Sequence, residues 1–256
     1  MIFLRTIVAY LLFSNFLFSQ ESKIKTEEAQ PETILFIGNS YLYYGDSLHN
    51  HFRRMVEEYF TGYDASSVKS ATIGGSRLKH HNVERLIKPK AISSIEKFDL
   101  VILQGGSGET LTVDSRKEFS YFVKKHIQTI RENNSQAALY MTHAYVEPHK
   151  KFTENQIKTI AETYTKVGIE NQTLVIPVGL AFDLAYQKQP SIVLHKFDGS
   201  HPSLLGTYLA ACTVFSSIYG ESPIGLKYDY FGTINEKDKM FLQEIADKAT
   251  SMFFNK

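Results

Sequence analysis

Short apolar runs alternate along the chain with longer segments in which apolar residues recur at helical spacing. A continuous apolar run bounded by turn residues is typical of a strand buried on both faces of a parallel sheet. We therefore predict strands at residues 33–38, 98–104, 137–143 and 173–179, and a weaker strand at 66–73.

The segments between these runs have the periodicity of amphipathic helices. In residues 47–60, for example, Leu48, Phe52 and Met55 recur at intervals of four and three and so share one face. The same reasoning predicts helices at residues 114–132, 152–168 and 203–219, a short helix ending at Gln187, and a closing helix at 235–253.

Strands that alternate with helices predict βαβ units. The expected fold class is therefore α/β, a three-layer α/β/α sandwich with a mostly parallel sheet of about five strands. Such sheets bind ligands beyond the carboxyl ends of their strands. The loops of interest are therefore those that begin at Gly38, Gly74, Gln104, His143 and Gly179.

The first residues have the pattern of a secretory signal peptide, with Arg5 before an apolar stretch and a polar segment after it. The apolar core, residues 6–18, is shorter than the roughly 20 residues of a membrane-spanning helix, so we prefer a signal over a membrane anchor. We predict a signal peptide at 1–19, a linker at 20–32 and a domain at 33–256. The protein is then periplasmic or secreted, with no stable membrane insertion after the signal is removed.

Composition and charge mainly exclude certain partners and certain structural features. The 256 residues are 43% hydrophobic and carry a formal net charge of +1. The lysines are scattered and do not form one basic stripe, so nucleic acid is not expected as a partner. Cys212 is the only cysteine, which excludes an intrachain disulfide, and its apolar surroundings indicate a core residue.

Ser40 stands directly after the first predicted strand, in the stretch "ILFIGNSYLYYGD". Gly38-Asn39-Ser40 is good turn chemistry, and Asn or Ser often caps a helix, so this stretch alone favours a simple turn. A catalytic interpretation needs a base beside the hydroxyl, because serine is otherwise a weak nucleophile.

The late segment "KFDGSHPS" supplies a candidate base. Asp198 precedes His201 by three residues, immediately before a predicted helix. A serine hydrolase requires such a carboxylate to hold its imidazole in one tautomer. The alternative is an ordinary turn at Asp198-Gly199 with Pro202 at the first helical position. Alone, the segment favours neither interpretation.

Two further loops offer hydrogen-bond donors for a developing oxyanion. Gly74 and Gly75 follow a predicted strand, and glycine lets a backbone N–H approach a ligand closely. Gln104 ends another strand, and its amide is a donor as well. The alternatives are a strand-ending turn for the glycines and a bond from Gln104 to loop backbone.

The histidines do not indicate a metal site. Neither His49-x-His51 nor His80-His81 has a recognised zinc spacing. No metal and no cofactor is therefore expected.

Aromatic residues near the strand ends are candidates for substrate contact. His143 and Tyr145 follow one strand, and Tyr41 follows Ser40, so all three should lie near the same cleft. Tyr43 and Tyr44 could line this cleft together with Tyr41, or all three tyrosines could equally close the interface between helix and sheet.

These blocks resemble the SGNH (GDSL-type) hydrolases. "ILFIGNSY" is similar to the first block of that family and "DGSHPS" to its last, Asp-x-x-His, while "ATIGGS" and "FDLVILQGGSGET" occupy the places of the second and third. The resemblance implies a flavodoxin-like sheet, with Ser40 as nucleophile, His201 as base and Asp198 as the acid that orients it. It also implies an oxyanion hole from the N–H groups of Ser40 and Gly75, with Gly74 as the alternative glycine.

The chain departs from the family pattern at two positions. Asn39 replaces the usual aspartate before the serine, and Gly106-Ser107-Gly108 stands where the family has Gly-x-Asn. We expect the amide of Gln104 to act as the oxyanion donor in place of the missing asparagine.

The expected function is that of an exported serine esterase that cleaves an O-acyl ester, in the first instance acetyl, on a carbohydrate. The polar, tyrosine-rich loop beside Ser40 favours such a small-molecule or carbohydrate ester. One alternative is a lipase or lysophospholipase, which needs a broad apolar acyl pocket. The other is a non-catalytic carbohydrate-binding protein of the same fold, which the missing asparagine favours.

Overall fold

A five-stranded sheet forms the centre of the computed structural model, which describes residues 30–255. All neighbouring strands are parallel, in the order β2-β1-β3-β4-β5. The predicted α/β class and parallel sheet are thus confirmed. The strands are β1 (Ile34–Gly38), β2 (Val68–Thr72), β3 (Leu100–Gln104), β4 (Gln136–Tyr140) and β5 (Leu174–Ile176).

Helices connect the successive strands and continue after the last one. Those before β4 are α1 (Ser40–Tyr43), α2 (Leu48–Tyr59), α3 (Val83–Leu86) and α4 (Val113–Glu132), with 3-10 turns at Ala65–Ser67 and Leu78–His80. Those after β4 are α5 (Gln156–Glu170), α6 (Val178–Lys188), α7 (Leu204–Tyr219) and α8 (Glu236–Phe254).

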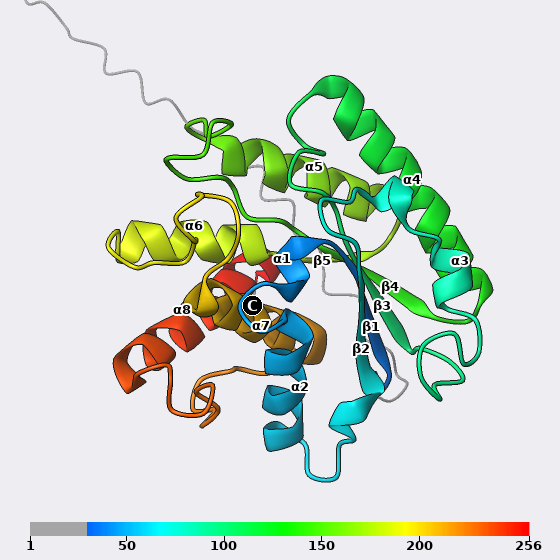
Figure 1. The fold of residues 1–256 in the computed structure, drawn as a ribbon, viewed down its shortest axis with the longest axis horizontal. Coiled ribbons are helices and arrows are strands. Elements are labelled where there is room, and N and C mark those ends of the chain that lie inside the picture. The colour runs from blue at the N-terminus through cyan, green and yellow to red at the C-terminus, as the bar shows by residue number, and fades with distance from the viewer. Residues whose placement is uncertain (1–29, 256) are drawn as a thin grey trace, which may run out of the picture.

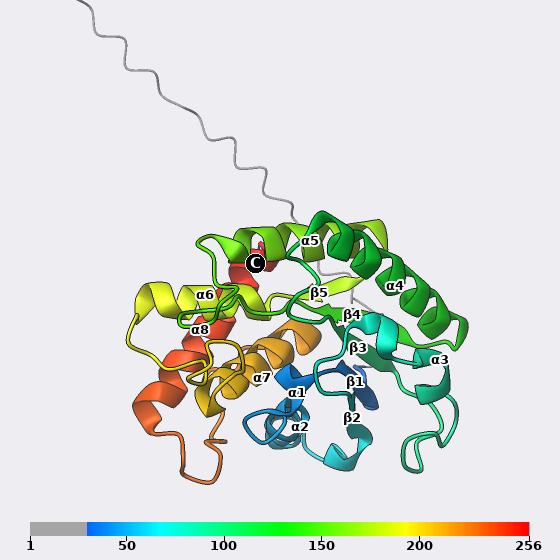
Figure 2. The same cartoon turned by 45° about the horizontal axis from the view of Figure 1, so that its top comes forward.

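Helices cover both faces of the sheet, which gives the three layers seen in Figure 1 and, turned, in Figure 2. Ile34 and Phe36 of β1 point into the core shared with α2, α6, α7 and α8. Leu35 and Ile37 point into the core shared with α3, α4 and α5. None of these four side chains is exposed, and this burial on both faces explains why the strand reads as a continuous apolar run.

The carboxyl ends of the four neighbouring strands β2, β1, β3 and β4 lie side by side on one side of the sheet. Gly38 of β1 pairs with Thr72 of β2, and Gln104 of β3 pairs with Tyr140 of β4. The loops that follow these four strands therefore begin side by side, which is where the sequence places the candidate residues.

The last strand is shorter than the sequence predicts. The strand expected at 173–179 ends at Ile176, and α6 already begins at Val178. Pro177 lies between them and has no backbone N–H to extend the ladder, so the strand stops there.

Other boundaries differ as well. The helix expected from residue 152 begins at Gln156, after Asn155 in a left-handed conformation with φ 61°. The strand expected at 137–143 ends at Tyr140, and the chain continues as a loop.

The predicted signal peptide and most of the predicted linker, residues 1–29, lie outside the described residues. The described part of the predicted 33–256 domain consists of the sheet and its helices. Over residues 30–255, no helix is long and apolar enough to cross a membrane.

Candidate active site

A tight turn after β1 places Ser40 at the edge of the sheet. The backbone of Gly38 packs against Gln104, and a Cβ atom at Gly38 would lie 2.3 Å from Gln104 Oε1. Only glycine allows this approach, which lets Oε1 accept a hydrogen bond from the N–H of Asn39 (2.8 Å). Ser40 then opens α1 and is 8% exposed.

Asn39 connects this turn to the loop after β2. Its Oδ1 accepts a hydrogen bond from the Tyr41 N–H (3.0 Å), and its Nδ2 donates to the Ser76 carbonyl (3.0 Å). A carboxylate could make the first bond but has no hydrogen for the second. The asparagine that departs from the family pattern therefore joins the serine loop to the neighbouring turn.

Ser40, His201 and Asp198 form a continuous line of hydrogen bonds, here called the Ser-His-Asp row. Ser40 Oγ lies 3.0 Å from His201 Nε2, although the two residues are 161 positions apart, and His201 Nδ1 lies 2.5 Å from Asp198 Oδ2. A carboxylate only accepts hydrogen bonds, so Nδ1 carries the proton. His201 Nε2 is then free to accept the proton of the serine hydroxyl.

Hydrogen bonds hold Asp198 in its ionised form. Burial alone would raise the pKa of this carboxyl, but the bond from the His201 ring and those from the N–H groups of Ser200 and His201 outweigh burial and lower the pKa to about 2. The side chains of His201 and Asp198 are 26% and 36% exposed. The charged end of the row is therefore partly open to solvent, whereas Ser40 is largely buried.

The turn after β2 presents Gly75. The Ser76 N–H donates to the Ile73 carbonyl (3.1 Å), so Gly74 and Gly75 are the central residues, and Gly75 has a φ of +68°. A positive φ at the third position is that of a type II turn, which favours glycine. Gly75 faces open space. Among the described residues, no acceptor is found for the Ser40 N–H or the Gly75 N–H, and their part in an oxyanion hole stays a prediction.

Gln104 lies beneath these groups. Its side chain is 1% exposed, its Oε1 accepts from the Asn39 N–H, and its Nε2 donates to the Gly105 carbonyl. Both ends of the amide thus bond to backbone, which is the alternative that the sequence left open. This geometry favours a role in holding the serine loop, and oxyanion donation by Gln104 stays a prediction.

The loop that carries His201 is attached to the segment after β4. His143 Nε2–H donates to the Ser200 carbonyl (2.8 Å), and the Val146 N–H donates to the Gly199 carbonyl (2.9 Å). Gly199 has a φ of +66°, and a Cβ there would lie 2.1 Å from the Val146 carbonyl oxygen. This close backbone contact between Gly199 and Val146 requires glycine, and it holds the loop that positions the His201 imidazole.

His143 and Tyr41 lie behind this loop. Their rings stack at 4.1 Å, and Phe182 stacks on His143 at 4.4 Å. Each is 2% exposed, and burial lowers the pKa of His143 and raises that of Tyr41, so both are uncharged. The Tyr41 hydroxyl bonds with Ser200 Oγ (3.0 Å). This burial favours a part in holding the loop, and their predicted contact with substrate stays a prediction.

Tyr145 connects the loops after β3 and β4. Its hydroxyl donates to Ser107 Oγ (2.9 Å), and its ring stacks on His149 at 3.8 Å. Tyr145 itself is 5% exposed, whereas Ser107 and His149 are half-buried. The pair of hydroxyls lies at the same sheet edge as the Ser-His-Asp row, and substrate contact by Tyr145 stays a prediction.

The sequence reasoning missed Glu109. Its side chain is fully buried, and its Oε2 accepts a hydrogen bond from the Gly106 N–H. Burial raises the pKa of this carboxyl to about 7, against the lowering effect of the Gly106 bond. The only sign of it in the sequence is an acidic residue soon after the glycines of "QGGSGET".

Stability should depend on pH through Glu109. Its pKa is raised from 4.5 to about 7 on folding, so between these values the folded chain binds a proton that the unfolded chain does not. The free energy of unfolding should therefore decrease by about 3 kcal/mol as the pH rises from 4.5 to 7. Urea unfolding at several pH values measures this slope.

The Glu109→Gln variant should lose this part of the slope, because the amide does not titrate. The matched control is Glu154→Gln on an exposed loop, which should keep the slope of the unmodified protein. Identical slopes in Glu109→Gln and the unmodified protein would show that this carboxyl does not titrate in that range.

A second serine-histidine pair supports the turn at Gly75. Ser76 Oγ lies 2.8 Å from His81 Nε2, but the residues are only 3% and 5% exposed. Burial lowers the pKa of His81 to about 4. A pair closed off from solvent does not meet a substrate, so it serves to hold the turn.

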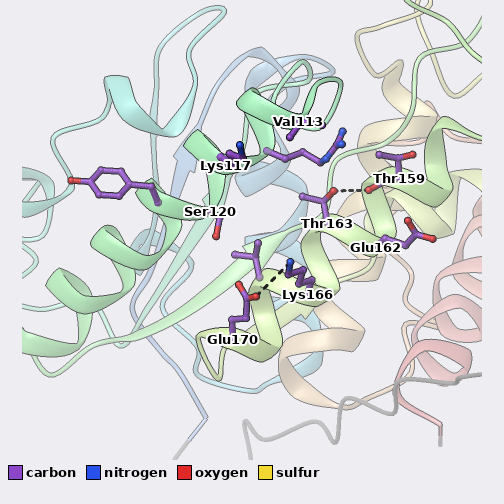
Figure 3. Close-up of a pocket in the computed structure, with 11 residues that line it drawn as sticks. Val113, Lys117, Ser120, Thr159, Glu162, Thr163, Lys166 and Glu170 are labelled. Carbon is purple, nitrogen blue, oxygen red and sulfur yellow. Dashed lines mark hydrogen bonds and ion pairs between the residues drawn. The ribbon is translucent and has the colours of Figure 1, made fainter.

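The groove drawn in Figure 3 lies away from the Ser-His-Asp row. It has a volume of about 760 Å³ and runs between α4 and α5, with Lys117, Thr163 and Lys166 among its lining residues. It contains none of the predicted site residues. Within residues 30–255, there is also no cluster of three or more side chains that could hold a metal ion.

Solved structures share this arrangement of strands and helices, although no protein-family model matches the chain and a search of curated proteins returned no significant match. A DUF4886 family protein from Bacteroides uniformis is 21% identical, with a TM-score of 0.65 over 85% of this chain and 93% of that one. A proposed SGNH hydrolase from Slackia heliotrinireducens is 22% identical, with a TM-score of 0.54 over 72% and 97% of the two chains. The chain has the SGNH-hydrolase fold.

Other proteins with the SGNH fold are more distant in sequence. An acetylxylan esterase from Geobacillus stearothermophilus, solved as a catalytic mutant, is 12% identical, with a TM-score of 0.55 over 75% of this chain and 96% of that one. At such low sequence identities, the similarity to these structures shows a shared fold only. The SGNH fold that the sequence blocks imply is confirmed by the strand order and by these structures.

Proposed function

We propose that the chain is an exported serine esterase that removes an O-acyl group, acetyl in the first instance, from a carbohydrate. The observation that carries this proposal is the Ser-His-Asp row, with 3.0 Å from Ser40 to His201 and 2.5 Å from His201 to Asp198. These distances, with Nε2 unprotonated and facing the serine hydroxyl, are what a nucleophile activated by a base requires.

The reaction begins when His201 Nε2 takes the proton of Ser40 and Ser40 Oγ attacks the acyl carbon. The N–H groups of Ser40 and Gly75 receive the negative charge on the carbonyl oxygen. His201 then gives its proton to the leaving alcohol oxygen, which leaves Ser40 acylated. A water molecule, deprotonated by His201, attacks the acyl carbon, and the proton returns to Ser40 as the carboxylic acid departs.

Neighbouring residues position these groups. Asp198 stays ionised and stabilises the imidazolium that forms in each half of the reaction. Gln104 and Asn39 hold the serine loop, and His143 holds the loop of His201, through the hydrogen bonds described above. The expected loss on removing such a support is smaller than that on removing the nucleophile.

A carbohydrate ester is favoured as the substrate by the polar surroundings of the row. The hydroxyls of Tyr145 and Ser107 lie at the same sheet edge, and hydroxyls are suited to bind those of a sugar. An acetylxylan esterase is among the proteins of this fold, which supports an acetyl group on a polysaccharide. The predicted export through residues 1–19 agrees with a polymeric substrate outside the cytoplasm.

A series of substrates tests this proposal. We expect kcat/KM to be highest for p-nitrophenyl acetate and to fall by about tenfold or more towards the octanoate, because a small acyl site excludes added methylenes. We also expect acetate to be released from acetylated xylan. A rise in kcat/KM with chain length would favour the lipase or lysophospholipase alternative, and no turnover of any ester would favour the non-catalytic one.

A further inference from the structure

One ring of the tyrosine-rich loop lies directly on the imidazole of the Ser-His-Asp row. Tyr44 stacks on His201 with 4.1 Å between ring centroids and an interplanar angle of 21°. The next aromatic contact of His201 is the edge of Tyr41, at 6.1 Å and 82°. Tyr44 thus covers one face of the imidazole.

Tyr44 is fixed to both sides of the site. Its N–H donates to the Ser40 carbonyl (3.0 Å), and its carbonyl accepts from Thr207 Oγ1 (3.2 Å) in the first turn of α7. Gly45 follows with φ +62°, and a Cβ there would lie 2.3 Å from Thr207 Oγ1. The backbone that presents the Tyr44 ring is therefore tied to the serine at one end and to the helix after His201 at the other.

The imidazole needs a support of this kind. The ring bonds to Ser40 and to Asp198, but the bond to Ser40 is lost when Ser40 is acylated, and the ring can then swing about its bond to Asp198. The His201 side chain is also 26% exposed. In turnover, Nε2 has to aim first at Ser40 and then at the leaving oxygen, and small errors in position are costly. The flat Tyr44 ring, stacked on the imidazole at van der Waals distance, restricts this swing but still lets the imidazole rotate within its own plane.

The charge of the imidazolium is a smaller part of the effect. The face of a tyrosine ring attracts a cation, but Lys196 Nζ already lies 5.1 Å from the centroid of Tyr44. The backbone N–H of Lys196 also donates to the His201 carbonyl (2.8 Å). Lys196 therefore contacts both the Tyr44 ring, through its side chain, and the loop of His201, through its backbone. Orientation, more than attraction of a second cation, is what the Tyr44 ring supplies.

We propose that Tyr44 is a positioning residue of the base: its ring, stacked on His201, keeps Nε2 aimed at Ser40 during the reaction. This inference rests on the proposed esterase function. The ring carries the effect and the hydroxyl does not, because no hydrogen bond of the Tyr44 hydroxyl is found in the part of the chain that the structure describes.

Steady-state kinetics of Tyr44→Phe and Tyr44→Leu with p-nitrophenyl acetate test the proposal. Tyr44→Phe keeps the ring and should stay within about twofold of the unmodified protein, whereas Tyr44→Leu should lower kcat on the order of tenfold with KM nearly unchanged. In a His201→Ala background, Tyr44→Leu should cause no further loss, because it acts through the imidazole.

Tyr121→Leu, an exposed tyrosine on α4, is the matched control and should retain full activity. If the unmodified protein turns over esters and Tyr44→Leu is as active as Tyr44→Phe, the positioning role is wrong while the esterase function stands. The same conclusion follows if Tyr44→Leu lowers activity equally with and without His201. If the unmodified protein itself turns over no ester, the proposed function fails first, and this inference fails with it.

Discussion

Replacement of Ser40 by alanine should lower kcat for p-nitrophenyl acetate by a factor on the order of 10⁴ or more. In the proposed mechanism Ser40 Oγ is the atom that is acylated, and His201 Nε2, which takes its proton, lies 3.0 Å from it. Without this hydroxyl, the remaining N–H donors and the base stabilise only direct attack by water. KM should change far less, because the methyl of alanine fits where the hydroxyl stood.

Intact mass after treatment with a serine-reactive fluorophosphonate gives an independent readout. The unmodified protein should gain one adduct, and Ser40→Ala should gain none. Ser120→Ala on α4, away from the row, is the control and should be labelled like the unmodified protein. An unlabelled and inactive unmodified protein would support the non-catalytic carbohydrate-binding alternative, and an adduct that persists in Ser40→Ala would exclude Ser40 as the nucleophile.

The Asp198→Asn variant should have the second largest effect, with kcat lowered on the order of 10³ to 10⁴-fold. Oδ1 of residue 198 accepts the N–H groups of Ser200 and His201, so in asparagine the oxygen takes this place and the NH₂ group faces His201 Nδ1. Nδ1 must then accept a hydrogen bond, and the ring proton moves to Nε2. Nε2 would donate to Ser40 Oγ and could no longer take its proton.

Kinetics and thermal unfolding together test the role of Asp198. The loss should appear in kcat, with the variant still folded, because asparagine has the same shape as aspartate. Asp114→Asn, an exposed carboxylate in the first turn of α4, is the control and should be fully active. Activity of Asp198→Asn within about threefold of the unmodified protein would contradict the tautomer role that the geometry of the row assigns.

The sequence predicted the strands and most helices, because these depend on local periodicity. The run at 33–38 and the helix at 203–219 correspond closely to β1 and α7. The three-residue spacing of Asp198 and His201 left a catalytic pair and an ordinary turn equally open, and the structure shows that His201 Nδ1 lies 2.5 Å from Asp198 Oδ2. The short α1 and α3 were missed, because four residues are too few for a periodic pattern.

The contacts of Gln104 and Glu109 could not be read from the sequence. Gln104 ends a strand, and whether its amide turns to the solvent or to the backbone depends on Gly38 of the neighbouring strand, which approaches it closely. Nothing in the sequence distinguishes Glu109 from the many glutamates that are exposed in proteins. Only the packing around the loop after β3 buries Glu109 and raises its pKa to about 7.

By itself, the sequence determined the fold class, since hydrophobic periodicity is a local property of the chain. The resemblance of its short motifs to the SGNH hydrolases singled out the three residues that lie together in the row. Only the tertiary structure decided which groups support that row. Tyr44 stacks on His201, and His143 bonds to Ser200, through contacts between segments far apart in the sequence. Such contacts depend on how the loops meet at the sheet edge, and no local pattern specifies that meeting.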